Sequence, residues 1–263
     1  MLLVIAIKKV QIHWRISMIE GWLAHITENF WSEIGSEIIY PLDLSIIISR
    51  SFPLSVIMLP LLRVSRVESW FQKQGIPFNF LCQDRSLCGC IIAVRGFGFI
   101  FADSSDTDNE RRYTIAHEVA HFLLDYLYPR QKVLHLFGES IRPMLDGERT
   151  PTKTETLDAL LSSVKQGTYT DLMPRSNKGD IDQAYILPAE EKADRLALEL
   201  LAPAYRVLSQ VALQDPKTIY ESNHITVQVL TSVYGLPPTV AKKYSAYLLR
   251  NHTQKTMVEW FGL

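Results

Sequence analysis

The chain has 263 residues, 47% of them hydrophobic and 21% charged, and its 27 basic and 28 acidic side chains give a formal net charge of -1. This composition predicts a packed core and excludes an intrinsically disordered chain. Because the charges nearly balance, the chain lacks the excess of basic residues typical of phosphate-binding surfaces, and direct nucleic-acid binding is not expected.

Residues 1–62 are expected to form an N-terminal, mostly helical extension, in which Gly21 to Trp31 carries apolar residues at helical spacing. The apolar stretch from Leu42 to Val64 contains charged residues and prolines and is too interrupted to span a bilayer. No membrane partner is therefore expected. The following stretch, Val64 to Gln74, predicts an amphipathic helix that ends at Gly75.

Two runs rich in β-branched and aromatic residues, Leu87–Val94 and Phe97–Ala102, are joined by a tight-turn sequence and predict a β-hairpin. The polar loop at 103–109 supplies oxygens that can cap a helix expected at about Glu110 to Leu127. Pro129 is expected to end this helix, because proline removes a backbone hydrogen bond from a helix interior.

From Arg130 to Leu187 the pattern is less regular. A capping box at 152–155 opens a short helix in this segment, and a mobile loop is expected from Thr168 to Asp182. A longer helix is expected at Ala189 to Leu201, preceded by a proline at its first turn. Residues 205–263 are expected to form a C-terminal helical segment, so the predicted fold class is α+β.

The three cysteines, Cys82, Cys88 and Cys90, are odd in number, and their spacing matches no standard zinc module. Disulfide scaffolding is therefore not expected. We expect these residues to be reduced thiols of a cytoplasmic protein.

The motif HEVAH at 117–121 lies within the helix expected at 110–127. Histidines four residues apart project from one face of a helix, so His117 and His121 can place two nitrogens about 2.0–2.1 Å from one zinc ion. Glu118 then lies beside the metal, where it can act as a general base towards water. A chance match on a surface helix is the alternative, but the apolar neighbours of the motif favour a buried helix.

Catalytic zinc usually takes a third protein ligand. The metzincin pattern requires glycine and histidine where Leu124 and Leu127 stand, and is excluded. A glutamate on a separate helix is the other solution, with Glu190 as the expected ligand and Glu191 as the alternative. Asp194 lies one turn after Glu190 and is expected to accept a hydrogen bond from a ligand histidine. A solvated helix start is the competing interpretation of these acidic residues.

These residues resemble the ImmA/IrrE family of metallo-endopeptidases. The run from Arg111 to His121 matches the family pattern R-[RF]-[FY]-T-[IL]-A-H-E-x-[AG]-H, and the run from Glu190 to Pro203 matches E-x-x-A-[ND]-x-[FL]-A-x-E-L-L-x-P. The resemblance covers about residues 65–240. The interval between the two runs is longer than the family usually shows, which suggests an inserted, lid-like segment at 130–187.

The resemblance implies a zincin-like metallopeptidase domain at 63–204, with a small β-sheet and an active-site helix. It implies a zinc ion held by His117, His121 and Glu190, with Glu118 as the catalytic acid and base. Known members of the family are cytoplasmic and cleave helix-turn-helix repressors, in stress responses or in the control of mobile elements. A zinc-dependent endopeptidase with a protein substrate, a repressor of this kind, is therefore expected.

Two details of the catalytic centre stay open in the sequence. A substrate segment is expected to lie along an edge of the sheet that contains Phe97–Ala102. The partner of the oxyanion is not singled out, and the candidates are Tyr113, Tyr126, His135 and Tyr185.

Two other classes of function compete with the peptidase. One is a non-catalytic regulatory binding protein in which zinc only stabilises the fold, and the other is an antitoxin-like partner. Glu118 argues against a purely structural zinc site, which has no need of that carboxylate and usually has four protein ligands. The sequence does not exclude the antitoxin-like partner.

Overall fold

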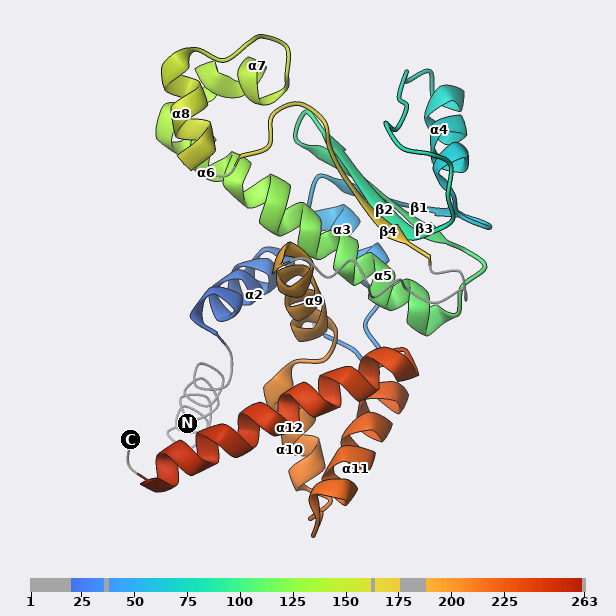
Figure 1. Ribbon diagram of the computed structural model, residues 1–263, viewed down its shortest axis with the longest axis vertical. Coiled ribbons are helices and arrows are strands. Elements are labelled where there is room, and N and C mark those ends of the chain that lie inside the picture. The colour runs from blue at the N-terminus through green and yellow to red at the C-terminus, as the bar shows by residue number, and fades with distance from the viewer. Residues whose placement is uncertain (1–19, 36–37, 162–163, 176–187, 262–263) are drawn as a thin grey trace. The chain divides into compact units, whose positions relative to one another are not determined.

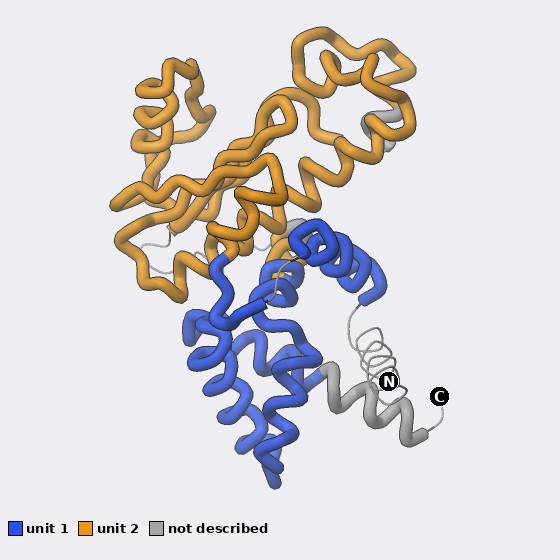
Figure 2. Tube along the Cα trace, turned by 180° about the vertical axis from the view of Figure 1, so that it is seen from behind, with its two compact units in different colours: residues 1–43, 195–263 blue, residues 44–194 orange. Residues whose placement is uncertain are grey.

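The computed structural model describes residues 20–35, 38–161, 164–175 and 188–261, with only the backbone described at 158–161, 188–189 and 251–261 (Figure 1). The chain divides into two compact units, residues 44–194 and residues 1–43 together with 195–263 (Figure 2). These boundaries differ from those expected after residues 62 and 204. Among the described residues, no helix has both the length and the apolar character needed to cross a bilayer.

The unit 44–194 is built around a four-stranded mixed sheet with the order β1-β3-β2-β4. Its strands are β1 (Leu54–Leu59), β2 (Leu87–Val94), β3 (Phe97–Asp103) and β4 (Tyr169–Pro174). β1 runs parallel to β3, whereas β2 is antiparallel to both β3 and β4. Together with the surrounding helices this sheet makes the fold α+β, as the sequence predicted.

The hairpin predicted from the sequence is confirmed. Arg95 and Gly96 connect β2 to β3 and have φ values of 51° and 84°. Positive φ at both central residues is typical of the type I′ turn, one of the two-residue hairpin turns that match the twist of the strands.

Two strands lie where the sequence analysis expected none. β1 belongs to the region expected to be a mostly helical extension, and β4 lies in the region expected to be a mobile loop. The run LSVIML of β1 is apolar except for Ser55 and lies between Pro53 and Pro60, so it carries no clear period that separates a strand from a helix. β4 is formed by pairing with β2, a long-range contact that local sequence does not reveal.

The two faces of the sheet are covered by different helices (Figure 1). On one face α4 (Val64–Lys73) buries Val67 and Phe71 against side chains of β2 and β3. On the other face α5 (Asp108–His121) packs on β2 and β3, and α3 (Leu44–Ser51) packs on β1. The helix that carries the HEVAH motif is thus held against the centre of the sheet.

α5 begins with a complete capping box, in which the Thr107 side chain accepts from the Glu110 backbone and the Glu110 side chain accepts from the Thr107 backbone. It continues into a π-helical segment, η1 (Phe122–Leu127), and then into α6 (Tyr128–Phe137). The prediction that the helix ends at Pro129 is therefore wrong. Pro129 lies in the first turn of α6, directly after the wider π-helical turns, and a first turn tolerates the missing proline N–H.

The first part of the inserted segment is folded around a small apolar core of its own. It comprises α6, the 3₁₀ turn η2 (Glu139–Ile141), α7 (Arg142–Leu145) and α8 (Lys153–Leu161). The buried side chains of this core are Val133, Ile141, Met144, Leu145 and Val164. The predicted capping box is present at the start of α8, where the backbone and side chains of Thr152 and Glu155 bond reciprocally. The end of the predicted insertion, 176–187, lies outside the described residues.

The other unit is helical in its described part. It contains α2 (Gly21–Ile34), α10 (Ala204–Ala212), α11 (Ile219–Ser232), α12 (Pro238–Phe261) and the second half of α9 (Pro188–Leu201). The helix expected at 189–201 and the helical character of 205–261 are thereby confirmed. Residues 1–19 of the expected extension lie outside the described residues.

Candidate metal centre

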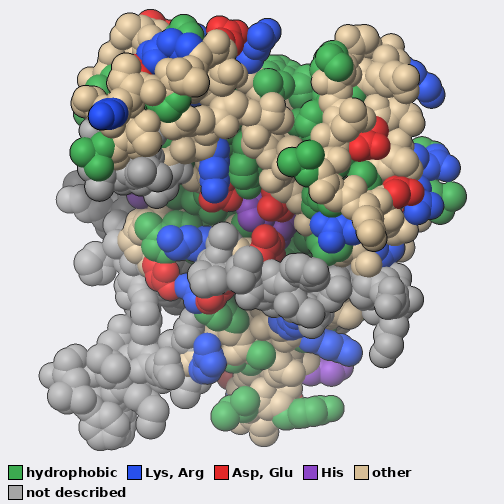
Figure 3. All heavy atoms as spheres, turned by 45° about the horizontal axis from the view of Figure 1, so that its top comes forward, with side chains coloured by type: hydrophobic (Ala, Val, Ile, Leu, Met, Phe, Trp, Pro, Cys, Tyr) green, Lys and Arg blue, Asp and Glu red, His purple; other side chains and the backbone are tan. Residues whose placement is uncertain are grey.

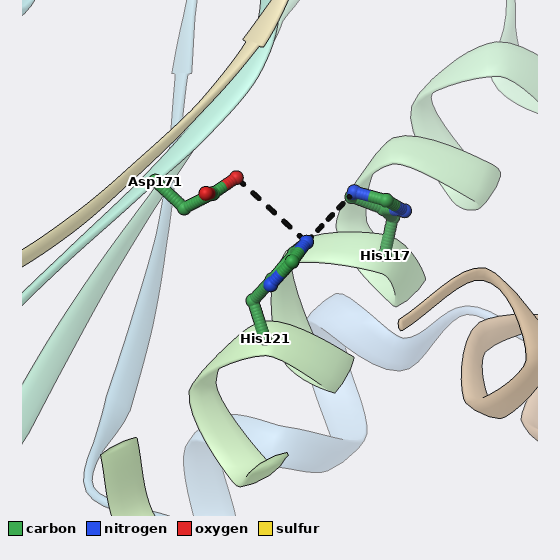
Figure 4. A group of neighbouring side chains, drawn as sticks. All are labelled: His117, His121 and Asp171. Atoms are coloured by element: carbon green, nitrogen blue, oxygen red, sulfur yellow. Dashed lines mark hydrogen bonds and ion pairs between the residues drawn. The ribbon is translucent and has the colours of Figure 1, made fainter. Parts of the chain in front are cut away.

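Two buried imidazole rings of α5 face one another. His117 and His121 are 2% and 1% exposed, and their Nε2 atoms are 3.1 Å apart (Figure 4). Their separation of one helical turn brings both rings to the same side of α5, as the motif predicted. Two lone-pair nitrogens this close can share one cation.

Two carboxylates from different elements approach these nitrogens. Oε2 of Glu190, in the first turn of α9, lies 3.3 Å from Nε2 of His117 and 3.5 Å from Nε2 of His121. Oδ2 of Asp171, in β4, lies 3.7 Å from Nε2 of His121 (Figure 4). Glu191 is exposed. The structure thus brings the expected residue Glu190 to the histidines and adds Asp171, which the sequence analysis did not identify.

The distances between these atoms suit a metal ion. Donor atoms of His117, His121 and Asp171 all lie within 4.8 Å of one another, and this group could hold a metal ion. Ligand atoms about 2.0–2.1 Å from a tetrahedral ion lie about 3.3–3.4 Å apart. The separations of 3.1, 3.3, 3.5 and 3.7 Å scatter around that value.

Each histidine is oriented by a carboxylate on its far side. Nδ1 of His117 donates to Asp194 and Nδ1 of His121 donates to Asp125, both at 2.8 Å. Such hydrogen bonds hold the proton on Nδ1 and leave Nε2 as the metal-binding nitrogen. Asp194 therefore has the position expected from the sequence.

Asp125 was missed by the sequence analysis, although a signal for it exists. It follows His121 by four residues, a spacing that puts both side chains on one face of a helix. Tyr169 of β4 adds to this side of the centre, because its hydroxyl donates to Oδ2 of Asp125 at 3.2 Å. On the other side, the hydroxyl of Tyr113 donates to Asp194 at 2.6 Å.

Glu118 is completely buried, and neither of its carboxyl oxygens has a hydrogen-bond partner among the described residues. It reaches this position because α5 approaches β2 at a glycine. A Cβ atom added to Gly89 would lie 2.3 Å from Cγ2 of Thr114 and 3.2 Å from Oε1 of Glu118. A buried carboxyl without a partner normally costs several kcal/mol, so this group is unlike a structural side chain.

Burial and neighbouring charges shift the acid–base equilibria of the centre. Burial, together with the charge of Asp171, raises the pKa of Glu118 to about 8. Burial lowers the pKa of His117, but hydrogen bonds with Asp194 and Glu190 outweigh it and raise that pKa to about 9.

The same balance operates at the second histidine. Burial lowers the pKa of His121, whereas hydrogen bonds with Asp125 and Glu190 raise it to about 11. Hydrogen bonds from both histidines in turn lower the pKa of Glu190. Without a metal, protonated imidazoles therefore supply the positive charge that the surrounding carboxylates require.

The centre is open to solvent on the carboxylate side. The side chains of Asp171, Glu190 and Asp194 are 24%, 28% and 32% exposed, while those of both histidines are nearly inaccessible. On the face shown in Figure 3, a small area of histidine side chain is visible next to acidic side chains. The carboxylate side of the centre is therefore in contact with solvent.

Two other predictions concerned the surroundings of the centre. The strand Phe97–Asp103 lies inside the sheet, so the edges available to an extended peptide are β1 and β4. Of the oxyanion candidates, Tyr113 is bonded to Asp194, the hydroxyl of Tyr126 accepts from the Gly96 backbone, and His135 is exposed on α6. Tyr185 lies outside the described residues.

The chain was also compared with known proteins. No protein-family model, no curated protein and no solved structure matches it.

Proposed function

We propose that this protein is a zinc-dependent endopeptidase with a zincin-like core of the kind the ImmA/IrrE resemblance implies. Zinc would be held by His117, His121 and Glu190, and Glu118 would be the catalytic acid and base. One observation supports this most strongly: the carboxyl of Glu118 is buried, has no hydrogen-bond partner among the described residues, and lies near enough to His117 and His121 to interact with their charges. Such a costly arrangement is understandable where the carboxyl acts on a reactant.

The residues of the chain have separate roles in this proposal. When bound, zinc would supply a Lewis acid that polarises the scissile carbonyl. Glu118 would take a proton from the attacking water and later give it to the leaving amine. Asp194 and Asp125 would keep the two imidazole rings in the required tautomer and orientation.

Two features of the surroundings support a proposal for the substrate class. β4 is an edge strand and carries Asp171 of the centre, so an extended segment of a protein substrate would pair with its outer side. The folded insertion α6–α8 would restrict access to partners that fit beside it. We propose a folded protein partner, a helix-turn-helix repressor as the family resemblance suggests.

A second candidate is a regulatory protein in which zinc only stabilises the fold, including the antitoxin-like partner. The presence of a fourth donor, Asp171, favours it, because structural zinc usually has four protein ligands. Glu118 favours the peptidase, because a structural zinc site has no use for a further carboxyl that is neither a ligand nor hydrogen-bonded within the described residues.

The variant Glu118→Gln separates the two candidates. It keeps the size of the side chain and removes its basicity, so zinc content and thermal unfolding should be unchanged. Cleavage should fall by about 10²–10⁴-fold, the usual contribution of general acid–base catalysis. Glu191→Gln, an exposed change in α9, is the matched control and should keep full activity.

The assay would incubate the zinc-loaded protein with candidate helix-turn-helix repressors and with an unfolded casein-like chain. Cleavage of one folded partner at a single site, with little digestion of the unfolded chain, is the expected result. Equal cleavage by wild type and Glu118→Gln would exclude the proposed general base. Rapid, unselective digestion of the unfolded chain would contradict the proposed specificity.

A further inference from the structure

Asp171 has a fixed place beside the centre because it belongs to a paired strand. In β4 it lies opposite Ile91 of β2. Its neighbours two residues away, Tyr169 and Met173, are buried, and successive side chains of a strand alternate between the two faces. The hydroxyl of Tyr169 lies 3.5 Å from Nδ1 of His121, so this face of β4 is turned towards the α5 histidines.

Two carboxylates from different elements therefore approach Nε2 of His121. Glu190 comes from the start of α9 and Asp171 from the edge strand. The distance from Oδ2 of Asp171 to Nε2 of His121, 3.7 Å, exceeds the corresponding distance for Glu190 by only 0.2 Å (3.7 against 3.5 Å). A displacement of that size lies within the rotation of an aspartate side chain that is 24% exposed.

We infer that Asp171 is a fourth protein ligand of the metal ion, so that the resting centre has two histidine and two carboxylate ligands. Four protein ligands complete a tetrahedral zinc site. The attacking water and the substrate carbonyl would then reach the metal only when the Asp171 carboxylate withdraws or the coordination expands to five. The inference rests on the proposed function in one respect, since both require a metal ion at His117 and His121.

The test uses the full-length protein, freed of metal with a chelator and titrated with Co²⁺, whose visible absorption reports its ligands. Asp171→Ala and the near-isosteric Asp171→Asn remove the carboxylate charge. Thr170→Ala, an exposed change on the other face of the same strand, is the matched control. Thermal unfolding of each metal-free variant shows whether the sheet is intact, and Asp171→Asn serves if the alanine variant fails to fold.

Both Asp171 variants should bind Co²⁺ roughly 100-fold more weakly than wild type and Thr170→Ala, since the loss of a direct ligand should exceed most losses of outer hydrogen bonds. Azide, a small anion that competes for an open metal position, should change the Co²⁺ spectrum of Asp171→Ala at a concentration at least tenfold lower than in wild type. Unchanged Co²⁺ affinity and identical azide titrations in wild type and both variants would overturn the inference.

The failure of this inference can be told apart from failure of the proposed function. If wild type binds Co²⁺ and loses it in Glu190→Ala but not in the Asp171 variants, the fourth ligand is wrong and the three-ligand site is kept. If Asp171 proves to be a ligand but wild type cleaves no partner, the peptidase proposal fails alone. No uptake of Co²⁺ by wild type would overturn both.

Discussion

At the scale of single residues, the centre is defined by what holds each imidazole. Nδ1 of His121 donates to Asp125 at 2.8 Å, and Tyr169 donates to the same carboxylate. The orientation of the His121 ring is therefore fixed by Asp125 and Tyr169, neither of which is a proposed metal ligand. Outer-shell carboxylates of this kind raise the basicity of the ligand nitrogen and fix its orientation.

The variant Asp125→Ala should therefore bind zinc about 10–100-fold more weakly than wild type, the usual cost of losing such a partner. Competition with a chromophoric chelator measures the affinity directly. Glu148→Ala removes an exposed carboxylate of the same unit and should have no effect. Equal zinc affinity in Asp125→Ala and wild type would show that the hydrogen bond does not orient His121.

The sequence predicted residues of the centre where local spacing carries the information. The four-residue spacing of His117 and His121 and that of Glu190 and Asp194 each follow from the helical repeat, and the structure brings all four side chains together. Asp171 offers no such signal, because it joins the centre only through the pairing of β4 with β2. Asp125 has the helical spacing from His121 but lies outside the HEVAH motif, which marks only the two histidines and Glu118.

At the scale of elements, the position of α5 depends on the absence of a side chain in β2. Gly89 lies under Thr114 and Glu118, and an added Cβ would come within 2.3 Å of a methyl carbon. Real Cβ atoms essentially never make contacts this short, so a larger residue at position 89 requires a shift of the Thr114 side chain or of the helix. The close packing of α5 also buries Glu118 beside the histidines.

Gly89→Ala should destabilise the protein by about 1–3 kcal/mol, as overpacking of a close-packed interior usually does. Thr114→Ser removes the methyl carbon in question and should restore part of the loss in the double variant. Gly21→Ala, where a Cβ meets nothing within 4 Å, is the control. Chemical denaturation of the wild type and of each variant measures the free energy of unfolding. An unchanged midpoint for Gly89→Ala would mean that α5 and β2 are not packed this tightly.

The elements divide into those that local sequence predicts and those that it does not. α4, the β2–β3 hairpin and α9 were predicted nearly to their ends, because amphipathic spacing, a positive-φ turn and a proline at the first helical turn act locally. The continuation of α5 through Pro129 was missed. It depends on a π-helical segment, in which Tyr128 N–H bonds to Leu123 C=O, and no propensity scale predicts that register change.

At the scale of the whole molecule, the units do not follow chain order. Residues 1–43 cluster with 195–263, so the first and last parts of the chain belong to one unit, and the middle part, which contains the centre, forms the other. A linear search for linkers places boundaries between consecutive segments and cannot find such an arrangement. The α+β class was nevertheless predictable, because it depends only on which elements are present.

Metal binding should stabilise the unit 44–194, and the effect should depend on pH. Zinc requires neutral imidazoles, whereas without metal the pKa of His117 is about 9 and that of His121 about 11, above the ordinary value of 6.5. The raised pKa values stabilise the metal-free protein fully below about pH 6.5, and this contribution is lost as the pH rises through 9 and then 11. Zinc therefore competes with protons that the folded protein binds tightly at low pH.

The increase in Tm on adding zinc should accordingly be small at pH 6 and larger at pH 8. With free zinc at 100 times the Kd, the gain in the free energy of unfolding is about 2.7 kcal/mol. The same zinc concentration exceeds the Kd by less at pH 6, because protons occupy the histidines. The double variant His117→Ala/His121→Ala should show no zinc response at either pH, and chelator should return wild type to its metal-free Tm. An equal zinc-dependent shift of wild-type Tm at both pH values would show that zinc binds elsewhere than on these two imidazoles.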